Sequence, residues 1–143
     1  DVRLVVAGKP TDEAEANHVS AASREDDRIT TEIGYVPNES IQLYLNAADA
    51  VVLPFRDVLT SGSAILAMTF GKPVVGPSTG CLPELLDGQT ELLYDPETDS
   101  IEDAMRRAAD ADLRSFGERN RRRVMGFDWE EIASATRDVY ERV

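Results

Sequence analysis

The chain has 143 residues, enough to bury a single sizeable core, with roughly two thirds of the unfolded surface removed from water. Hydrophobic residues make up 42% of it and lie in short runs along the whole sequence, which excludes an intrinsically disordered or fibrous protein. No apolar stretch approaches the ~20 residues that cross a bilayer, and the first residues lack the layout of a secretory signal. The sequence therefore predicts a cytoplasmic globular domain without a transmembrane segment.

Acidic residues dominate the charge. Fifteen basic against 27 acidic residues give a formal net charge of −12, which repels nucleic acid and anionic membranes unless a local basic patch reverses the field. We therefore expect no nucleic-acid partner. Only Lys9 and Lys72 are lysines, and the other cations are arginines. This bias indicates a halophilic protein whose carboxylates are screened by salt; an acidic domain from an ordinary cytoplasm is the alternative.

The sequence offers few soft metal ligands. Cys81 is the one cysteine and His18 the one histidine, so neither an internal disulfide nor a Cys/His zinc site can form. We expect no metal and no cofactor.

Strands and helices are predicted to alternate. Short apolar runs predict strands over 2–7, 29–33, 50–53, 73–76 and 91–94, the first of them buried on both faces. Helices are expected over 12–24, from Asn38 or Ser40 to about 48, over 61–70 and from about 100, with a short turn or helix at 84–86. From 110 onward the chain reads as helical, with a break at Gly126 and a last helix over 129–142. This order implies βαβ crossovers in an α/β domain with a Rossmann-like doubly wound parallel sheet and a helical C-terminal segment.

One loop combines small and hydroxyl-bearing residues at a helix start. Ligands of such sheets bind beyond the carboxyl ends of the strands, and Thr60, Ser61, Gly62 and Ser63 follow the third predicted strand. The free N–H groups and the dipole of a helix start can hold phosphate. The alternative is an ordinary capped helix, in which Thr60 or Ser61 satisfies its own backbone. The glycine patterns of nucleoside triphosphatases and dinucleotide-binding proteins are absent.

Two other loops are weaker candidates. The backbone of Gly34, Tyr35 and Val36 could pair with the edge of a nucleobase on which Tyr35 stacks, although Tyr35 could equally be a packed rim aromatic. The loop 78–84 allows close approach at Gly80 but is more simply a turn.

Arginines gather near the end of the sequence. Residues 119, 121, 122 and 123 predict a solvated helical face or a contact with a neighbouring domain. Phe127 and Trp129 are interpreted as an apolar anchor for the last helix.

Four motifs in order resemble the carboxyl-terminal, donor-binding half of retaining glycosyltransferases of family 4 (group 1), which have the GT-B architecture. They are IGYVPNE with LYLNAADAVVLP (33–39 and 43–54), AMTFGKPVV (67–75), GCLPELLDG (80–88) and FDWEEIA (127–133).

The resemblance implies a nucleoside-diphosphate sugar as donor substrate. In that family the base contacts the loop that aligns with Gly34, Tyr35 and Val36, and helix-start N–H groups that align with 60–63 hold the diphosphate. Stabilising the diphosphate as leaving group is an electrostatic role, so no protein nucleophile and no catalytic residue is assigned. The implied acceptor is a glycan or lipid-linked molecule bound by an N-terminal domain. The full-length protein is expected to be cytoplasmic, either free or peripheral to a membrane.

The sequence departs from the family pattern in two places. The paired glutamates that bind sugar and ribose hydroxyls align with Val58 and Leu66. Either Asp57, Ser61 and Ser63 take these contacts, or donor binding is weaker or lost. The strand and loop GRLxxxKG, which supplies Arg and Lys to the diphosphate, has no counterpart before Asp1. We therefore expect 1–143 to be one nucleotide-sugar-binding domain, excised from a longer enzyme and inactive alone. A nucleotide-sugar epimerase and a non-catalytic interaction scaffold are the alternatives.

Overall fold

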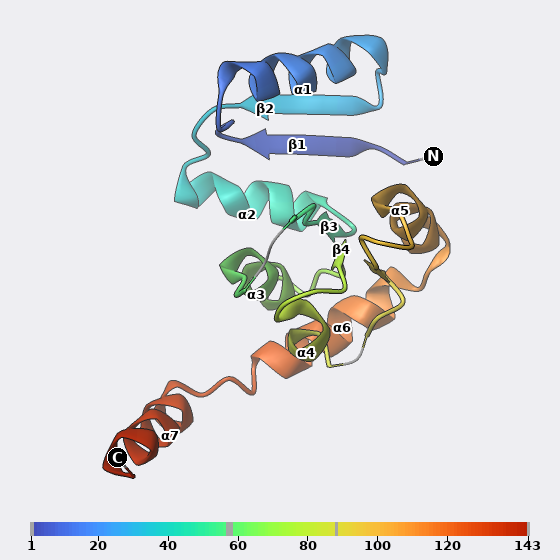
Figure 1. Ribbon diagram of the computed structural model, residues 1–143. Helices are drawn as coiled ribbons and strands as arrows, with labels where there is room; N and C mark the ends of the chain where they lie inside the picture. Colours follow the sequence, from blue (N-terminus) through green and yellow to red (C-terminus); the bar gives the residue numbers. More distant parts are fainter. Residues whose placement is uncertain (1, 57–58, 88, 143) are drawn as a thin grey trace. The chain divides into compact units, whose positions relative to one another are not determined.

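The computed structural model describes residues 2–56, 59–87 and 89–142 and divides the chain into two compact units, Asp1–Tyr44 and Leu45–Val143. The first unit holds β1 (Leu4–Gly8), α1 (Glu13–Glu25), β2 (Ile29–Ile33) and the start of α2 (Asn38–Ala47) (Figure 1). The second holds β3 (Val51–Val52), α3 (Gly62–Thr69), β4 (Val74–Pro77), α4 (Leu82–Leu85), β5 (Leu93–Tyr94), α5 (Ile101–Asp110), α6 (Leu113–Val124) and α7 (Trp129–Glu141).

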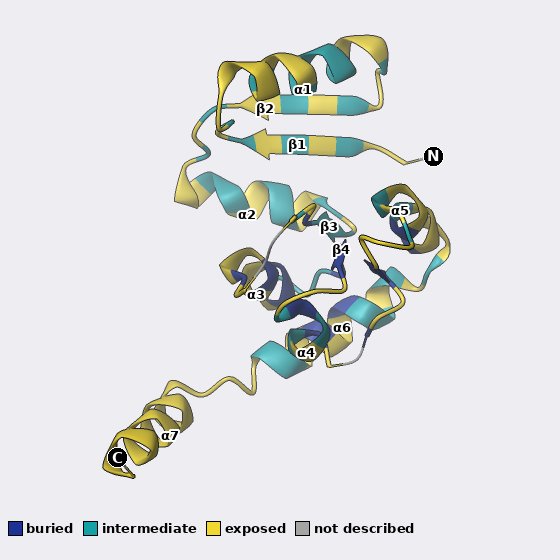
Figure 2. Cartoon of the chain, in the orientation of Figure 1, coloured by how far each residue is buried: buried dark blue, intermediate teal, exposed yellow. Residues whose placement is uncertain are grey.

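The sheet of the first unit is a parallel pair with one covered face. β1 and β2 run in register from Leu4 opposite Ile29 to Gly8 opposite Ile33. α1 packs on one side, where the Thr31 hydroxyl lies 3.2 Å from that of Ser23. Val5 points to the other side and is 54% exposed. Within the first unit, the prediction of a first strand buried on both faces is therefore wrong: β1 has an alternating, half-buried pattern, and α1 covers one face of the pair (Figure 2).

β4 lies at the centre of the second unit. The strand order is β3-β4-β5, all parallel, and every residue of β4 is buried. Val74 belongs to an apolar cluster with residues of α3 and α4, and Val75 to a second cluster with Tyr94 and Ala104. Successive residues of a strand point to opposite faces. The helices that follow β3 and β4 therefore share one face of this sheet, and α5 packs on the other.

Parallel strands joined by helical crossovers confirm the predicted α/β class. Backbone pairing among the described residues forms two sheets, β1-β2 and β3-β4-β5. β2 has the predicted limits. The predicted break at Gly126 is confirmed, since α6 ends at Val124 and α7 begins at Trp129.

α6 packs closely against the turn between α3 and β4. Gly71 lies just after the C-cap of α3, and its backbone is in the left-handed region, with φ of +66°. Asn120 of α6 is buried and donates through Nδ2 to the Lys72 carbonyl at 2.9 Å, while its Oδ1 accepts from Gln89 Nε2 at 3.1 Å. A Cβ added to Gly117 would lie 2.0 Å from the Gly71 carbonyl oxygen. Any residue larger than glycine at position 117 would therefore collide with the backbone of Gly71.

Gly117→Ala tests this close approach. Helix propensity alone would stabilise the variant by about 1 kcal/mol, but the clash is with backbone and forces α6 away, so we expect a net loss of roughly 1–3 kcal/mol. Thermal unfolding followed by circular dichroism should show a lower midpoint. Gly62→Ala is the control, because a Cβ there meets nothing within 4 Å. An unchanged or higher midpoint for Gly117→Ala would contradict the packing.

A carboxylate after α1 links stability to pH. Arg28 Nε donates to Asp26 Oδ1 at 2.9 Å, and this side-chain hydrogen bond lowers the pKa of Asp26 from 3.8 to about 2. A depressed folded-state pKa contributes stability above the unfolded pKa and loses it as the pH falls through the folded one. We therefore expect a small decline in unfolding free energy from about pH 4 to pH 2, measured by denaturant titration. Asp26→Asn should flatten this part of the profile and Asp27→Asn should not; identical profiles would refute the assignment.

Candidate functional site

α3 begins at the carboxyl edge of the β3-β4-β5 sheet. β3 leads into Leu53, whose N–H donates to the Val75 carbonyl at 2.8 Å, and the chain then loops to the start of α3. Because the strands are parallel, the loop that follows β4 opens on the same edge, with Ser78, Thr79 and Gly80 exposed. This is the edge at which doubly wound sheets bind ligands.

Ser61 caps α3. Its hydroxyl accepts a hydrogen bond from the Ala64 N–H at 3.1 Å, and its carbonyl accepts from the Ile65 N–H at 3.2 Å. The side chain is buried. The capped-helix alternative is therefore correct for this residue, whose hydroxyl serves its own helix.

The next two residues leave the first turn open. Gly62 and Ser63 are exposed, and no hydrogen bond between described residues uses their N–H groups. A Cβ added to Gly62 would meet nothing within 4 Å. The opposite side of α3 is held in the core by Ala64, Ala67 and Met68. Free N–H groups at the positive end of a buried helix form a site that favours anions.

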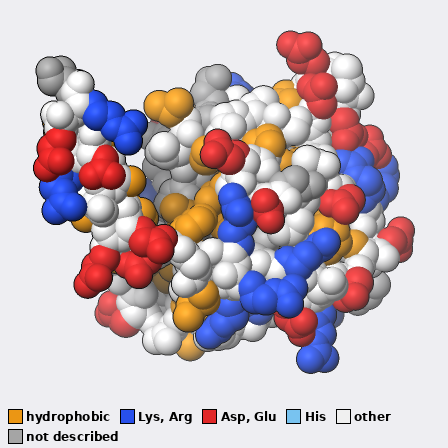
Figure 3. Space-filling model, turned by 90° about the horizontal axis from the view of Figure 1, so that it is seen from below, with side chains coloured by type: hydrophobic (Ala, Val, Ile, Leu, Met, Phe, Trp, Pro, Cys, Tyr) orange, Lys and Arg blue, Asp and Glu red, His pale blue; other side chains and the backbone are white. Residues whose placement is uncertain are grey.

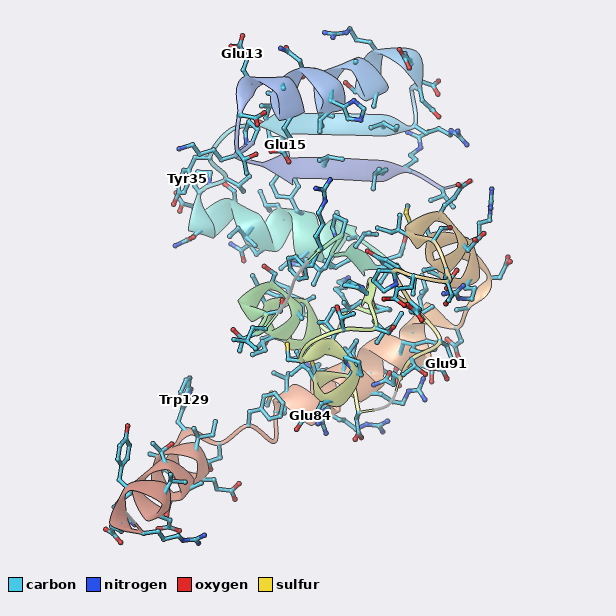
Figure 4. All side chains as sticks on the ribbon, in the orientation of Figure 1. Glu13, Glu15, Tyr35, Glu84, Glu91 and Trp129 are labelled. Carbon is cyan, nitrogen blue, oxygen red and sulfur yellow. The ribbon has the colours of Figure 1, made fainter. Side chains whose placement is uncertain are left out.

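The loop after β2 lies in the first unit. Gly34 has φ of +150°, which favours glycine, and its N–H donates to the Gly8 carbonyl at 2.9 Å. That N–H extends the β1-β2 pairing and is not free for a base. Tyr35 is 75% exposed and its side chain projects from the ribbon (Figure 4), so it is not a packed rim aromatic. Val36 is half-buried.

Of the residues that stand at or beside the family's two glutamate positions, the structure describes Leu66. Asp57 and Val58 lie outside the described residues. Leu66 is exposed on α3 and has no side-chain hydrogen-bonding atom. Sequence reasoning passed over Arg56, an exposed cation in the loop that leads from β3 to α3. A lone arginine forms no motif, and only the position of its loop at the carboxyl edge distinguishes it.

An ion pair between Arg107 and Asp99 lies close to the end of β5. Arg107 Nη2 donates to Asp99 Oδ2 at 2.7 Å and to the Leu93 carbonyl at 2.9 Å. The hydrogen bond from Arg107 lowers the pKa of Asp99. This arginine therefore fixes α5 to β5 and offsets a carboxylate that follows the strand.

The described ranges hold neither a cluster of metal-ligating side chains nor a membrane-spanning helix. Residues 2–56, 59–87 and 89–142 contain no group of three or more His, Cys, Asp or Glu side chains that could hold a metal ion. In the same part of the chain every helix is too short or too polar to cross a membrane.

Three glycosyltransferases have sequences similar to this chain. The MMP alpha-(1->4)-mannosyltransferase of Mycolicibacterium hassiacum is 32% identical over 111 residues, which cover 73% of this chain and 27% of the relative. The 2-deoxystreptamine N-acetyl-D-glucosaminyltransferase of Streptomyces fradiae is 32% identical over 123 residues, 86% of this chain and 28% of the relative. The GDP-mannose:glycolipid 4-beta-D-mannosyltransferase of Xanthomonas campestris pv. campestris is 28% identical over 100 residues, which cover 68% of this chain and 29% of the relative. The chain spans less than a third of each of them.

A solved structure and a family model extend the likeness. Sucrose-phosphate synthase from Thermosynechococcus elongatus superposes with a TM-score of 0.75 at 27% identity, covering 98% of this chain and 38% of that one. The model of the family described as glycosyl transferases group 1 matches residues 1–111, which include the candidate α3 edge and three of the four motifs. The chain therefore belongs to the group 1 glycosyltransferases, whose architecture is GT-B.

Proposed function

We propose that this chain is the donor-binding part of a retaining glycosyltransferase, which transfers a sugar from a nucleoside diphosphate to a glycan or lipid-linked acceptor. The open first turn of α3 carries the proposal: the N–H groups of Gly62 and Ser63 form no hydrogen bond with another described residue, and they lie at the edge where such sheets bind ligands. The names of the relatives support it, since one of them uses GDP-mannose and a glycolipid. A cytoplasmic location remains a prediction.

In this proposal the N–H groups of Gly62 and Ser63 stabilise negative charge on the diphosphate. When the bond between the sugar and the diphosphate breaks, negative charge grows on the departing phosphate oxygen. N–H groups aimed at such an oxygen typically contribute 10²–10³-fold in rate. The acceptor hydroxyl attacks the sugar carbon on the face the diphosphate leaves and gives its proton to a phosphate oxygen, so no side chain needs to act as nucleophile. Arg56 would add positive charge beside the diphosphate.

The other contacts follow from the family alignment. Gly34, Tyr35 and Val36 would contact the base, with Tyr35 as the exposed ring that can stack on it. In place of the family's paired glutamates, Asp57 and Ser63 would hold sugar and ribose hydroxyls, while Thr60 would belong to the diphosphate site. Ser61 would contribute through its cap on α3, because its side chain is buried.

Gly62→Asp tests the diphosphate site. A carboxylate at the open first turn would repel the diphosphate and compete for the same N–H groups, so we expect affinity for the preferred nucleotide to fall at least tenfold, about 1.4 kcal/mol. Calorimetric titration with UDP, GDP and ADP, in dilute buffer and in molar KCl, measures this and identifies the base.

Two variants serve as controls. Ser134→Asp on α7 adds the same charge at an exposed position away from α3, and Gly62→Ala adds a side chain without charge. Both should bind nearly as the parent chain does. If Ser134→Asp lowers nucleotide affinity as much as Gly62→Asp does, the loss comes from the added net charge and not from the first turn of α3. A folded parent chain that binds none of the three nucleotides would favour the interaction scaffold, which the apolar Leu66 permits.

A further inference from the structure

α3 has an uncharged surface beside its open first turn. The chain has a net charge of −12, yet no residue from Gly62 to Thr69 is acidic or basic. Charged side chains are common elsewhere: Figure 3 shows acidic and basic groups scattered over the face seen from below, with apolar ones between them. A carboxylate on α3 would repel a diphosphate held at its start. The composition of this helix therefore suits the part of a ligand that adjoins the diphosphate.

Leu66 lies in line with Gly62 on the exposed side of α3. Residues four apart on a helix lie one above the other, and helical side chains lean over the turn that precedes them. Leu66 is 38% exposed and Ile65 is 40% exposed, while the opposite side of the helix is buried in the core. Gly62 itself has no side chain, and a Cβ there would meet nothing within 4 Å. A group attached to a phosphate at Gly62 therefore meets the methyl groups of Leu66.

This side of α3 offers hydroxyl groups very few partners. Among the described residues 62–69, Ile65 and Leu66 have no polar side-chain atom, and the Thr69 hydroxyl donates to the Ile65 carbonyl at 2.9 Å. Ser63 lies at the edge, about 60° around the helix from Leu66. A ligand hydroxyl against Leu66 would lose contact with water without gaining a hydrogen bond, which lowers affinity.

A nucleotide-sugar has two rings that could lie against Leu66. They are the ribose and the transferred sugar, one at each end of the diphosphate. The transferred sugar must present its anomeric carbon to the acceptor, so the ribose is the ring that can rest along α3. Natural ribonucleotides and deoxyribonucleotides differ in this ring at the 2′ position, while both carry the 3′-hydroxyl. The 2′ position is therefore where an apolar neighbour can distinguish the two classes.

We propose that Leu66 is a specificity-determining residue that favours 2′-deoxyribonucleoside diphosphates over ribonucleoside diphosphates. The 3′-hydroxyl, common to both classes, is left for Ser63. This inference rests on the proposed function and names the class of nucleotide that the same site prefers.

Matched pairs of nucleotides test the preference. The full 143-residue chain is titrated by calorimetry with UDP, GDP and ADP and with their 2′-deoxy counterparts. For the preferred base, we expect the deoxy form to bind about fivefold more tightly, because a buried hydroxyl without a partner costs roughly that much or more. The two members of a pair carry the same charge, so the effects of salt and of net charge cancel in the ratio of their affinities.

Two substitutions separate chemistry from shape at this position. Leu66→Gln adds an amide oxygen that can accept from the 2′-hydroxyl, so the affinity ratio should shift toward the ribonucleotide by about fivefold or more. Leu66→Met keeps an apolar side chain of similar size and should keep the ratio of the parent chain. Leu66 is partly exposed, so both variants should fold, and thermal unfolding followed by circular dichroism verifies this.

Ile132→Gln on α7 is the matched control. Ile132 is 45% exposed. Trp129 of the same helix is 82% exposed, and Figure 4 shows it projecting from the start of α7, so it does not anchor that helix as its sequence suggests. The control makes the same kind of change, apolar to amide, on an exposed helix away from α3. It should leave the affinity ratio unchanged.

Three results would overturn this inference alone. The first is a parent chain that binds the ribonucleotide as tightly as its deoxy counterpart, or more tightly. The second is an unchanged ratio in Leu66→Gln, and the third is an equal change in Ile132→Gln. A folded parent chain that binds none of the six nucleotides would overturn the proposed function and this inference together, so the two failures are distinguishable.

Discussion

Burial of β4 on both faces is the constraint on which the second unit depends. Its four residues are all buried, and the side chains of Val74 and Val75 point into different apolar clusters. A strand covered in this way fixes α3 and α4 on one side and α5 on the other. It also fixes which ends of β3 and β4 face solvent, and those ends carry the loops from which α3 and α4 begin. The candidate site is thus a consequence of core packing.

α3 divides its residues between core and site. Ala64, Ala67 and Met68 hold the helix against β4, and burial of such side chains stabilises by about 1.5–3 kcal/mol for the larger ones. The cap formed by Ser61 satisfies the Ala64 N–H, while Gly62 and Ser63 keep theirs toward solvent. A rigidly packed helix whose first turn is open can present donors to an anion without reorganising. This division explains how a site can exist without a glycine-rich phosphate signature.

Arginines of this acidic chain have distinct tasks. Arg107 and Arg123 donate to backbone carbonyls and so join helices to strand and turn, as structural residues. Arg28 pairs with a carboxylate at the end of α1. Arg121 and Arg122 of α6 form no ion pair with another described residue. Planar guanidinium groups suit both tasks because they make several hydrogen bonds at once.

Apolar periodicity, capping residues and motif order are local properties, and they were enough to predict the alternation of strands and helices, the limits of β2, the end of α6 near Gly126 and the family. They also placed Gly62 and Ser63 at a helix start. Three features depend on packing between distant segments: the one-sided cover of β1 within the first unit, the inward position of Ser61, and the need for glycine at position 117 beside Gly71. Each of these depends on which distant segment packs against the residue, and the identities of its sequence neighbours do not encode that contact.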